Sequence, residues 1–540
     1  MKKIKMKAII ALCTVMLVVA GCQSVAGLEL NSMIVKALKA ETQESRGSVT
    51  LNIDFAEEAY EGLNDRERRM LELLSEVKIV IDSSKKENAS RQSIDGALVL
   101  GDREVGFSFR QDEKQAVLQI DGLKRPVVIP LDEESLLGLG GDLVDGAPLD
   151  SVLEEAVAPV GEQVATDAST ESVGDVAEEL IDRVGGYWIS NLPNATRLDV
   201  KPVTDDVYGG GKAAWQVDAG WQGMELFDWA QSYVKALIAD PDGMHEMLNS
   251  LFEVFQDHPE SGVTGEDGGP LLDSDKEAFV EEGTEAIGEL LQETADSMQE
   301  AREAGGLEEM FSPASSVNVK LLLDGSLDIR KLDAALLWKP AVADADGEVF
   351  PISSVSLRIQ SDSWNVNGAV SADRPAPSDK SWTMDRWVSN DAGSSRLLLD
   401  FDKSSDAYKL LKNDFQAGLQ SAAFYSYGYY DSFISTPSGV TLVPLRTLAD
   451  SFGATVAYDK ARKKWRIDDG AKGRTIYVAK GSKVVYANGV KSQLSFPATV
   501  VDDALYVPAR DFAKLFGASL KVNQSDYDYD RYLELQREVG

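Results

Sequence analysis

The sequence predicts an α+β protein of several domains, in which curved antiparallel sheets are packed with helices. Short segments of alternating apolar and polar residues recur along the chain, helical patterns lie between them, and an internal repeat stands near the C-terminus. Short strands at spacings of about 8–12 residues, separated by polar turns, are typical of antiparallel meanders. A chain of 540 residues is long enough for roughly three or four domains.

The first sheet is predicted from about Gly47 onward. An amphipathic helix is expected at 57–76, before the strands follow one another closely. Because the strands alternate, each should bury one face and expose the other. The strand patterns lie at 77–82, 97–100, 105–109, 116–120 and 127–131.

The middle of the chain is strongly acidic. Residues 240–310 hold 21 Asp and Glu side chains against two basic ones, a density typical of a solvated face or a partly disordered insertion. A calcium loop is the alternative, but 344–348 is only a fragment of the Asp-x-Asp-x-Asp-Gly pattern, so we predict no metal site. Strand patterns return at 316–323 and 355–360, as a second antiparallel sheet or a continuation of the first.

The N-terminus carries a positive segment followed by an apolar one. Four lysines precede an apolar run at 8–20, whose 13 residues suit a signal peptide and fall short of the ~20 that a spanning helix needs. The run ends in Val19-Ala20-Gly21-Cys22, which resembles the lipobox of bacterial lipoproteins. That resemblance implies that Cys22 is acylated and that the protein is held at the extracytoplasmic face of the cell membrane.

An internal repeat occupies 443–518, where seven residues recur at an offset of 64 positions. In each copy Pro should open a short helix, Phe should face its core side, and Gly should give it a left-handed end. The Arg of each copy is expected to cap or pair within its own half, with a ligand contact as the alternative. The copies are Val443, Pro444, Arg446, Ala449, Phe452, Gly453 and Ala454, and Val507, Pro508, Arg510, Ala513, Phe516, Gly517 and Ala518.

These motifs flank a hairpin with the turn sequence Asn488-Gly489, a strong type I′ signal. Together they resemble the copper amine oxidase N-terminal-like domain, often called a stalk domain, over about 433–522. The resemblance implies a non-catalytic appendage of a kind that recurs on surface proteins of Gram-positive bacteria. The expected segments are 1–21 (signal peptide), 22–46 (tether), 47–200 (β meander with helix), 201–310 (strand, then acidic helices), 311–400 (second β region), 401–432 (connection) and 433–540 (stalk domain).

Charge and composition exclude several classes of function. The net charge is −35 and becomes −39 once the four leader lysines are removed, which argues against any nucleic-acid partner. The two cysteines are Cys13, in the leader, and Cys22, so the mature chain has no disulfide and no thiolate metal site. The two histidines, His245 and His258, cannot supply the three copper ligands of an amine oxidase. We therefore expect no cofactor and no enzymatic activity, although an undetected carboxylate pair for glycoside hydrolysis stays open.

Two functions fit these observations. The favoured one is a cell-envelope lipoprotein that is attached to the membrane by its lipid. Its stalk domain, at net +4 over 433–540, would act as a spacer or docking module toward anionic wall polymers or envelope proteins. The alternative is a carrier of a hydrophobic molecule, because the N-terminal meander with its helix resembles the lipoprotein carriers of the LolA type. An open, apolar concave face of the sheet would favour the carrier.

Overall fold

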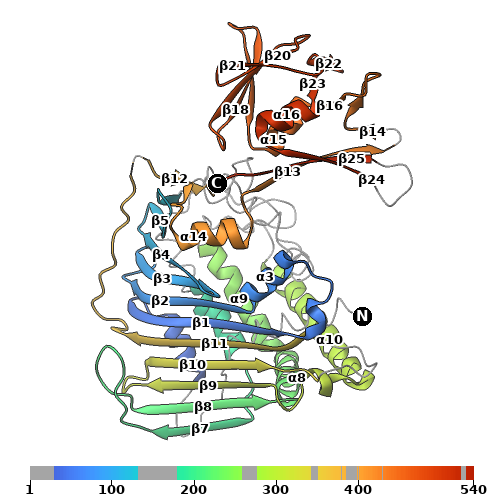
Figure 1. Ribbon diagram of the computed structural model, residues 1–540. Helices are drawn as coiled ribbons and strands as arrows, with labels where there is room; N and C mark the ends of the chain where they lie inside the picture. Colours follow the sequence, from blue (N-terminus) through green and yellow to red (C-terminus); the bar gives the residue numbers. More distant parts are fainter. Residues whose placement is uncertain are drawn as a thin grey trace. The chain divides into compact units, whose positions relative to one another are not determined.

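The chain forms two compact units (Figure 1). The computed structural model describes residues 30–131, 179–257, 276–341, 351–378, 380–384, 398, 400–427, 430–524 and 531–540. The N-terminal unit comprises Met1–Ile120 and Val127–Ser381, and the C-terminal unit comprises Asp121–Pro126 and Trp382–Gly540. Helices and antiparallel strands occur in both units, which confirms the α+β class.

The N-terminal unit is built on one continuous antiparallel sheet. Its strands run in the order β6-β5-β4-β3-β2-β1-β11-β10-β9-β8-β7. The strands are β1 (Gln43–Phe55), β2 (Glu76–Lys86), β3 (Gln92–Leu100), β4 (Arg103–Gln111), β5 (Gln115–Ile120), β6 (Val127–Pro130), β7 (Arg197–Pro202), β8 (Trp215–Gln222), β9 (Ser316–Leu323), β10 (Ile329–Trp338) and β11 (Ile352–Trp364).

Strand β1 joins the two β regions, for which the sequence left open whether they form one sheet or two. Val49 on β1 pairs with Ile79 on β2 and with Ile359 on β11. The structure therefore unites in one sheet what the sequence divided into 47–200, 201–310 and 311–400. The alternation inside each strand was visible from the sequence, but the pairing of segments about 300 residues apart has no local signal.

Helices of the N-terminal unit lie on one face of this sheet, where α8, α9 and α10 are seen behind the strands in Figure 1. Helix α8 packs against β8, and α3 packs against β2. The helices are α2 (Leu30–Leu38), the 3-10 turn η1 (Glu57–Tyr60), α3 (Asp65–Leu74), the π-helical η2 (Ile181–Gly185), α7 (Gly186–Ser190), α8 (Glu225–Ile238), α9 (Pro241–Asp257), α10 (Lys276–Ala304) and α11 (Leu307–Met310).

The single helix expected at 57–76 was wrong in extent. The chain forms η1, turns at Gly62 with φ of +74°, and starts again at α3. Asn64 and Glu67 form a capping box at the start of α3, in which the Asn64 side chain accepts from the backbone of Glu67 and the Glu67 side chain accepts from the backbone of Asn64. The capping box therefore starts a new helix at Asp65, although the apolar periodicity runs on from the preceding turn.

Three small sheets and two short repeat-related helices make up most of the C-terminal unit. The sheet orders are β14-β13-β25-β24, β15-β16-β23-β22 and β17-β18-β19-β20-β21. The elements are β12 (Trp382–Thr383), α14 (Asp406–Lys409), η5 (Leu410–Asp414), β13 (Leu419–Tyr427), β14 (Tyr430–Asp431), β15 (Ile434–Ser435), β16 (Thr441–Pro444), α15 (Leu445–Ser451), β17 (Thr455–Asp459), β18 (Lys464–Asp469), β19 (Arg474–Val478), β20 (Val484–Ala487), β21 (Val490–Gln493), β22 (Thr499–Val501), β23 (Ala504–Pro508), α16 (Ala509–Phe516), β24 (Ser519–Gln524) and β25 (Arg531–Glu538).

The segment 401–432, expected to be a connection, contributes strand β13 to this unit. Residues of β13 pair along their length with β25, from Leu419 opposite Glu538 to Ser426 opposite Arg531. Ala422 and Phe424 are buried in the same core as both repeat helices. The folded unit therefore begins before residue 433.

Several sequence-based expectations lie outside the described residues. They concern the signal peptide at 1–21, the lipidation site Cys22, the helical segments within 133–178 and the acidic fragment 344–348. Among the helices that the structure does describe, none is long and apolar enough to cross a bilayer.

Candidate functional site

One face of the large sheet is apolar across nine neighbouring strands, β7 to β4 in spatial order. Residues opposite one another in an antiparallel pair project from the same face, so the register defines a continuous row. We call it the apolar row. Its members are Leu198, Ala219, Val319, Ala334, Ile359, Val49, Ile79, Leu98 and Val105.

The helices cover this row unevenly. At the β8–β9 end, Ala219 and Val319 are 6% and 7% exposed, and they share a core with residues of α2, α7 and α8. In the middle of the row, Val49 and Ile79 are 37% and 39% exposed. Central strands normally bury their apolar face. The row is therefore an apolar surface that is closed by helices at one end and open over β1 and β2.

Two strand glycines lie beside the open part of the row. Gly47 on β1 and Gly96 on β3 both pair with Ile81 on β2. A Cβ atom at Gly96 would lie 2.2 Å from the carbonyl oxygen of Val80 and 3.1 Å from Cζ of Phe107. Glycine within a strand often marks a place where another group comes close to the backbone. Here both cross-strand neighbours of Ile81 lack a side chain.

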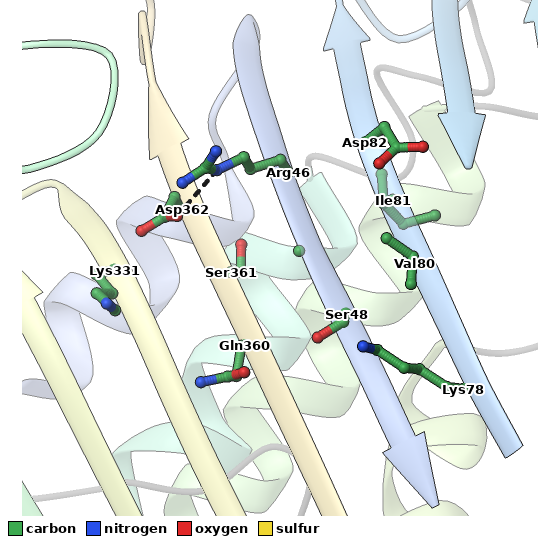
Figure 2. A pocket seen from close by; sticks show the side chains of 11 residues that line it. Arg46, Ser48, Lys78, Val80, Ile81, Asp82, Lys331, Gln360, Ser361 and Asp362 are labelled. Atoms are coloured by element: carbon green, nitrogen blue, oxygen red, sulfur yellow. Dashed lines mark hydrogen bonds and ion pairs between the residues drawn. The ribbon is translucent and has the colours of Figure 1, made fainter. Parts of the chain in front are cut away.

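The opposite face of the same strands is polar and carries a shallow hollow of about 440 Å³. Figure 2 views it from the side away from the helices. Arg46 pairs with Asp362, with Nε 3.1 Å from Oδ2, and its guanidinium carbon lies 3.4 Å from the centre of the Tyr208 ring. The hollow is lined by Arg46, Gly47, Ser48, Lys78, Val80, Ile81, Asp82, Lys331, Gln360, Ser361 and Asp362.

The chemistry of this hollow is that of a solvated surface. Beside it, Asp333 accepts from Arg358 at 2.8 and 3.0 Å, and this interaction holds the pKa of the Asp333 carboxyl below its usual value. The lining residues include no histidine, cysteine or tyrosine. Its carboxylates and cations are arranged for mutual pairing across strands, and the arrangement points to no reaction.

The C-terminal repeat forms two related strand–helix units. Val443 on β16 pairs with Val507 on β23, and a short helix follows each strand. Pro444 and Pro508 are the N-cap residues of α15 and α16, one position earlier than predicted, because each also ends its strand. The helices end at glycines with positive φ, +62° at Gly453 and +69° at Gly517, as left-handed helix ends require.

The two hairpin turns have left-handed backbones too. Asn488 and Gly489 have φ of +48° and +82°, and Asp502 and Asp503 have φ of +46° and +61°. Positive φ at both central residues is the mark of a type I′ turn. Each repeat thus runs from a strand through a short helix to a left-handed helix end, and hairpins connect the strands between the two repeats. This order of elements agrees with the domain predicted from the sequence. Residues 431–529 match the copper amine oxidase N-terminal domain.

The predicted identity of the C-terminal domain is thus confirmed, and the matched domain is a non-catalytic one. No curated protein matches the chain. The match covers 99 of 540 residues (431 to 529) and does not extend to the large N-terminal sheet. In the structure, the copper amine oxidase N-terminal domain is completed by β13 and β25, which lie entirely outside the matched residues.

At the centre of this domain lies a buried ion pair that the sequence did not reveal. The side chains of Arg537 and Asp469 are both 0% exposed, with contacts of 2.6 and 3.0 Å between them. Arg537 also donates to the carbonyl oxygens of Phe452 and Phe516 and to Oε1 of Gln420. All five guanidinium N–H groups therefore have an acceptor.

Arg537 binds the two repeats at equivalent positions. Phe452 and Phe516 are the same residue of the two copies, and the guanidinium carbon lies 4.6 and 5.5 Å from the centres of their rings. One side chain thus satisfies the carbonyl at the end of each helix and lies within cation–π distance of both rings, whose centres are 5.3 Å apart. No sequence pattern around Arg537 predicts this role.

The capping or pairing expected of Arg446 and Arg510 within their own halves is not seen among the described residues. Both side chains are exposed, and neither has a hydrogen bond or ion pair with a described residue. Both arginines lie in the first turn of their helices, where the unpaired backbone groups are N–H donors, so a guanidinium, which only donates, finds no backbone acceptor there. The alternative of a ligand contact at the two arginines stays a prediction.

Possible metal ligands do not come together in the part of the chain that the structure describes. Among the described residues there is no cluster of three or more His, Cys, Asp or Glu with metal-ligand geometry. His245 is exposed on α9, where its Nδ1 lies 2.9 Å from Nδ2 of Asn249. His258 falls outside the described residues. The part of the acidic region that is described, within α9 and α10, is helical and mostly solvent-facing.

Proposed function

We propose that this protein is a lipid-anchored binding protein of the cell envelope whose N-terminal unit holds a long apolar ligand against the apolar row. The observation that carries the proposal is the exposure of Val49 and Ile79, 37% and 39%, in the middle of a sheet face whose β8–β9 end is buried under helices. Acylation of Cys22 supplies the attachment, and the copper amine oxidase N-terminal domain serves as the docking module.

The row favours an acyl or similarly extended hydrocarbon ligand. Every member from Leu198 to Val105 is apolar and aliphatic, so nothing in the row recognises a polar group. Each methylene that a ligand buries contributes about 0.8 kcal/mol. Pockets for small molecules are commonly of this kind, apolar and formed between layers of secondary structure. The polar face opposite has no such continuous surface.

The test compares substitutions on neighbouring residues that face opposite ways. Ile79→Asp places a charge in the open part of the apolar row, whereas Val80→Asp places the same charge in the polar hollow on the other face. Binding of a fluorescent long-chain fatty acid to the chain from Gln23 to Gly540 should weaken at least about 100-fold for Ile79→Asp, because burying an unpaired charge is costly. Val80→Asp should bind as the unsubstituted chain does.

Organic extraction of the purified chain provides the second measurement. A lipid should co-purify with the unsubstituted protein and with Val80→Asp, and it should be absent from Ile79→Asp. Equal binding by the two variants, or no binding of any acyl probe by the unsubstituted chain, would remove the proposal. Circular dichroism melting curves of both variants separate loss of the ligand from loss of the fold.

The docking role rests on a different observation, the contrast of charge within one chain. The full sequence has a net charge of −35, whereas residues 433–540 have a net charge of +4. A cationic domain on an anionic protein directs that domain toward anionic partners. Retention on isolated cell wall should therefore weaken when the salt concentration is raised, and it should be lost when residues 401–540 are deleted. Retention by the remaining part would contradict this role.

A further inference from the structure

The five-stranded sheet of the C-terminal domain has an outward face of tyrosines and cations. The register runs straight across it, from Ala457 through Arg466, Tyr477 and Tyr486 to Lys491. The residues that alternate with these, including Ile467, Ile476 and Val485, are 0% exposed in the core. Because successive side chains of a strand project to opposite faces, the row lies on the side away from the core. We call this row, with Arg462 and Lys464, the tyrosine face.

The charge of this sheet is opposite to that of the protein. Residues 455–493 hold ten Lys and Arg against three Asp, a net of +7, in a chain of −35. Asp469, one of the three, is buried and its charge is balanced by Arg537. Asp459 and Asp468 pair with Arg462 and Arg466. Cations beyond these pairs remain in excess over the whole sheet.

Cations hold the two tyrosine rings in place. Nζ of Lys464 lies 4.3 Å from the centre of the Tyr486 ring, and the guanidinium carbon of Arg462 lies 5.4 Å from the centre of the Tyr477 ring. Arg462 is fixed in turn by Asp459 at 2.7 Å, and the same hydrogen bond is the main cause that lowers the pKa of the Asp459 carboxyl. The phenol groups and the ammonium groups therefore present a defined set of donors.

We propose that the tyrosine face binds a polyanionic carbohydrate polymer, in which sugar or polyol units alternate with phosphodiester or carboxylate groups. Lys464 and Lys491 would bind the anionic groups, and the hydroxyls of Tyr477 and Tyr486 would bind the hydroxyls between them. The proposal rests on the docking role proposed above and names the surface and the chemistry of its partner. Lys464 on β18 and Lys491 on β21 are separated by three strand spacings of about 4.8 Å each, with the two tyrosines on the strands between them. This alternation of cations and hydroxyls suits a linear polymer laid across the sheet.

Two other anionic partners fit less well. Single-stranded nucleic acid binds through bases stacked on free aromatic faces, but here the ring faces are approached by Lys464 and Arg462. Membrane surfaces are bound by faces that bury large apolar side chains beside their cations, and the row from Ala457 to Lys491 has none. The tyrosine face is therefore best suited to a partner that offers anionic groups and hydroxyls for direct hydrogen bonds.

The test measures binding of poly(glycerol phosphate) to the chain from Gln23 to Gly540 by isothermal titration calorimetry. The double variant Lys464→Glu with Lys491→Glu should lose at least about tenfold in affinity. The matched control is Lys514→Glu with Lys521→Glu, the same change of charge at two exposed lysines of α16 and β24, and it should change affinity by less than about twofold. Affinity of the unsubstituted chain should fall steeply from low to physiological salt.

Each outcome decides a separate point. If both double variants lose affinity equally, the docking role stands and the tyrosine face is not the site. If the unsubstituted chain binds no anionic polymer, the docking role fails as well. Short single-stranded DNA or phosphatidylglycerol vesicles that bind as tightly as poly(glycerol phosphate) would overturn the assigned class of partner. Neutral dextran should not bind, and unchanged melting curves exclude unfolding as the cause of any loss.

Discussion

Asp469→Asn should destabilise the copper amine oxidase N-terminal domain more than any surface substitution. It removes the charge that balances Arg537, while it keeps the shape of the side chain. Both partners are 0% exposed, and loss of one partner of a buried pair typically costs about 3–5 kcal/mol because the other charge is left uncompensated. At 1.4 kcal/mol per factor of ten, that range corresponds to a roughly 140- to 3,700-fold rise in the open population.

Hydrogen exchange followed by mass spectrometry measures this rise in the open population without separating the domain from the rest of the chain. Amides of β18 and β19, which lie beside Asp469, should exchange faster by that factor, while amides of the N-terminal unit serve as an internal reference. The variant Asp459→Asn is the control, since its partner Arg462 is 64% exposed and its own carboxyl is 15% exposed, against 0% for both members of the Asp469 pair, and pairs in contact with solvent contribute less. It should leave exchange in β18 and β19 nearly unchanged.

The double variant Asp469→Leu with Arg537→Met sharpens the test. Replacing both members of a buried pair by apolar residues of similar volume is often neutral or stabilising. Here the change also leaves the carbonyl oxygens of Phe452 and Phe516 and Oε1 of Gln420 without their donor, so exchange should return only part of the way to that of the unsubstituted chain. Two results would refute the reasoning. One is an Asp469→Asn effect below about 1 kcal/mol, and the other is a double variant that is less stable than either single one.

Three further predictions concern other parts of the chain. Gly517→Val and Gly453→Val should each lower the stability of the C-terminal domain by about 1–2 kcal/mol in urea titrations, because both glycines have positive φ; no effect at either site would show that the helix ends tolerate side chains. Burial, with a smaller contribution from Tyr187, raises the pKa of Tyr233 to about 12 from 10.0, so the folded state keeps a proton that the unfolded state loses. Stability of the N-terminal unit should fall as pH rises from about 10 to 12, and Tyr233→Phe should flatten that part of the stability curve. Cys22→Ser should release the protein from membranes into the medium, and full retention in the membrane fraction would contradict the lipid anchor.

Local features of the fold were predictable from the sequence. Alternation at 77–82 and 97–100 lies within β2 and β3, and the turn at Asn488-Gly489 has the backbone that its residues demand. These features depend on neighbours in the sequence, such as the period of a strand or the freedom of glycine. The repeat predicted the C-terminal domain for the same reason, because its two copies carry their own helix starts and ends.

Contacts between distant segments were not predictable. The pairing of Val49 with Ile359 and the site of Arg537 between Phe452 and Phe516 depend on which segments meet. Nothing in the sequence near Arg537 distinguishes it from Arg446 or Arg510, the arginines that the repeat singled out. The open part of the apolar row was likewise hidden, because alternation shows that a face is apolar and does not show what covers it.

The central position of β1 has a consequence for how the chain acquires its fold. Strand β1 pairs with β11, and Val49 and Ile359 are 310 residues apart (359 minus 49). At the usual ~5–20 residues per second of synthesis, β1 and β2 wait on the order of 15 s to a minute before their partner exists. During that time a hairpin with an apolar face presents an unpaired edge, which other chains can extend. High contact order slows folding further. Assembly of the N-terminal unit should therefore depend on a holding chaperone, and its yield should fall with expression rate more steeply than that of the C-terminal domain.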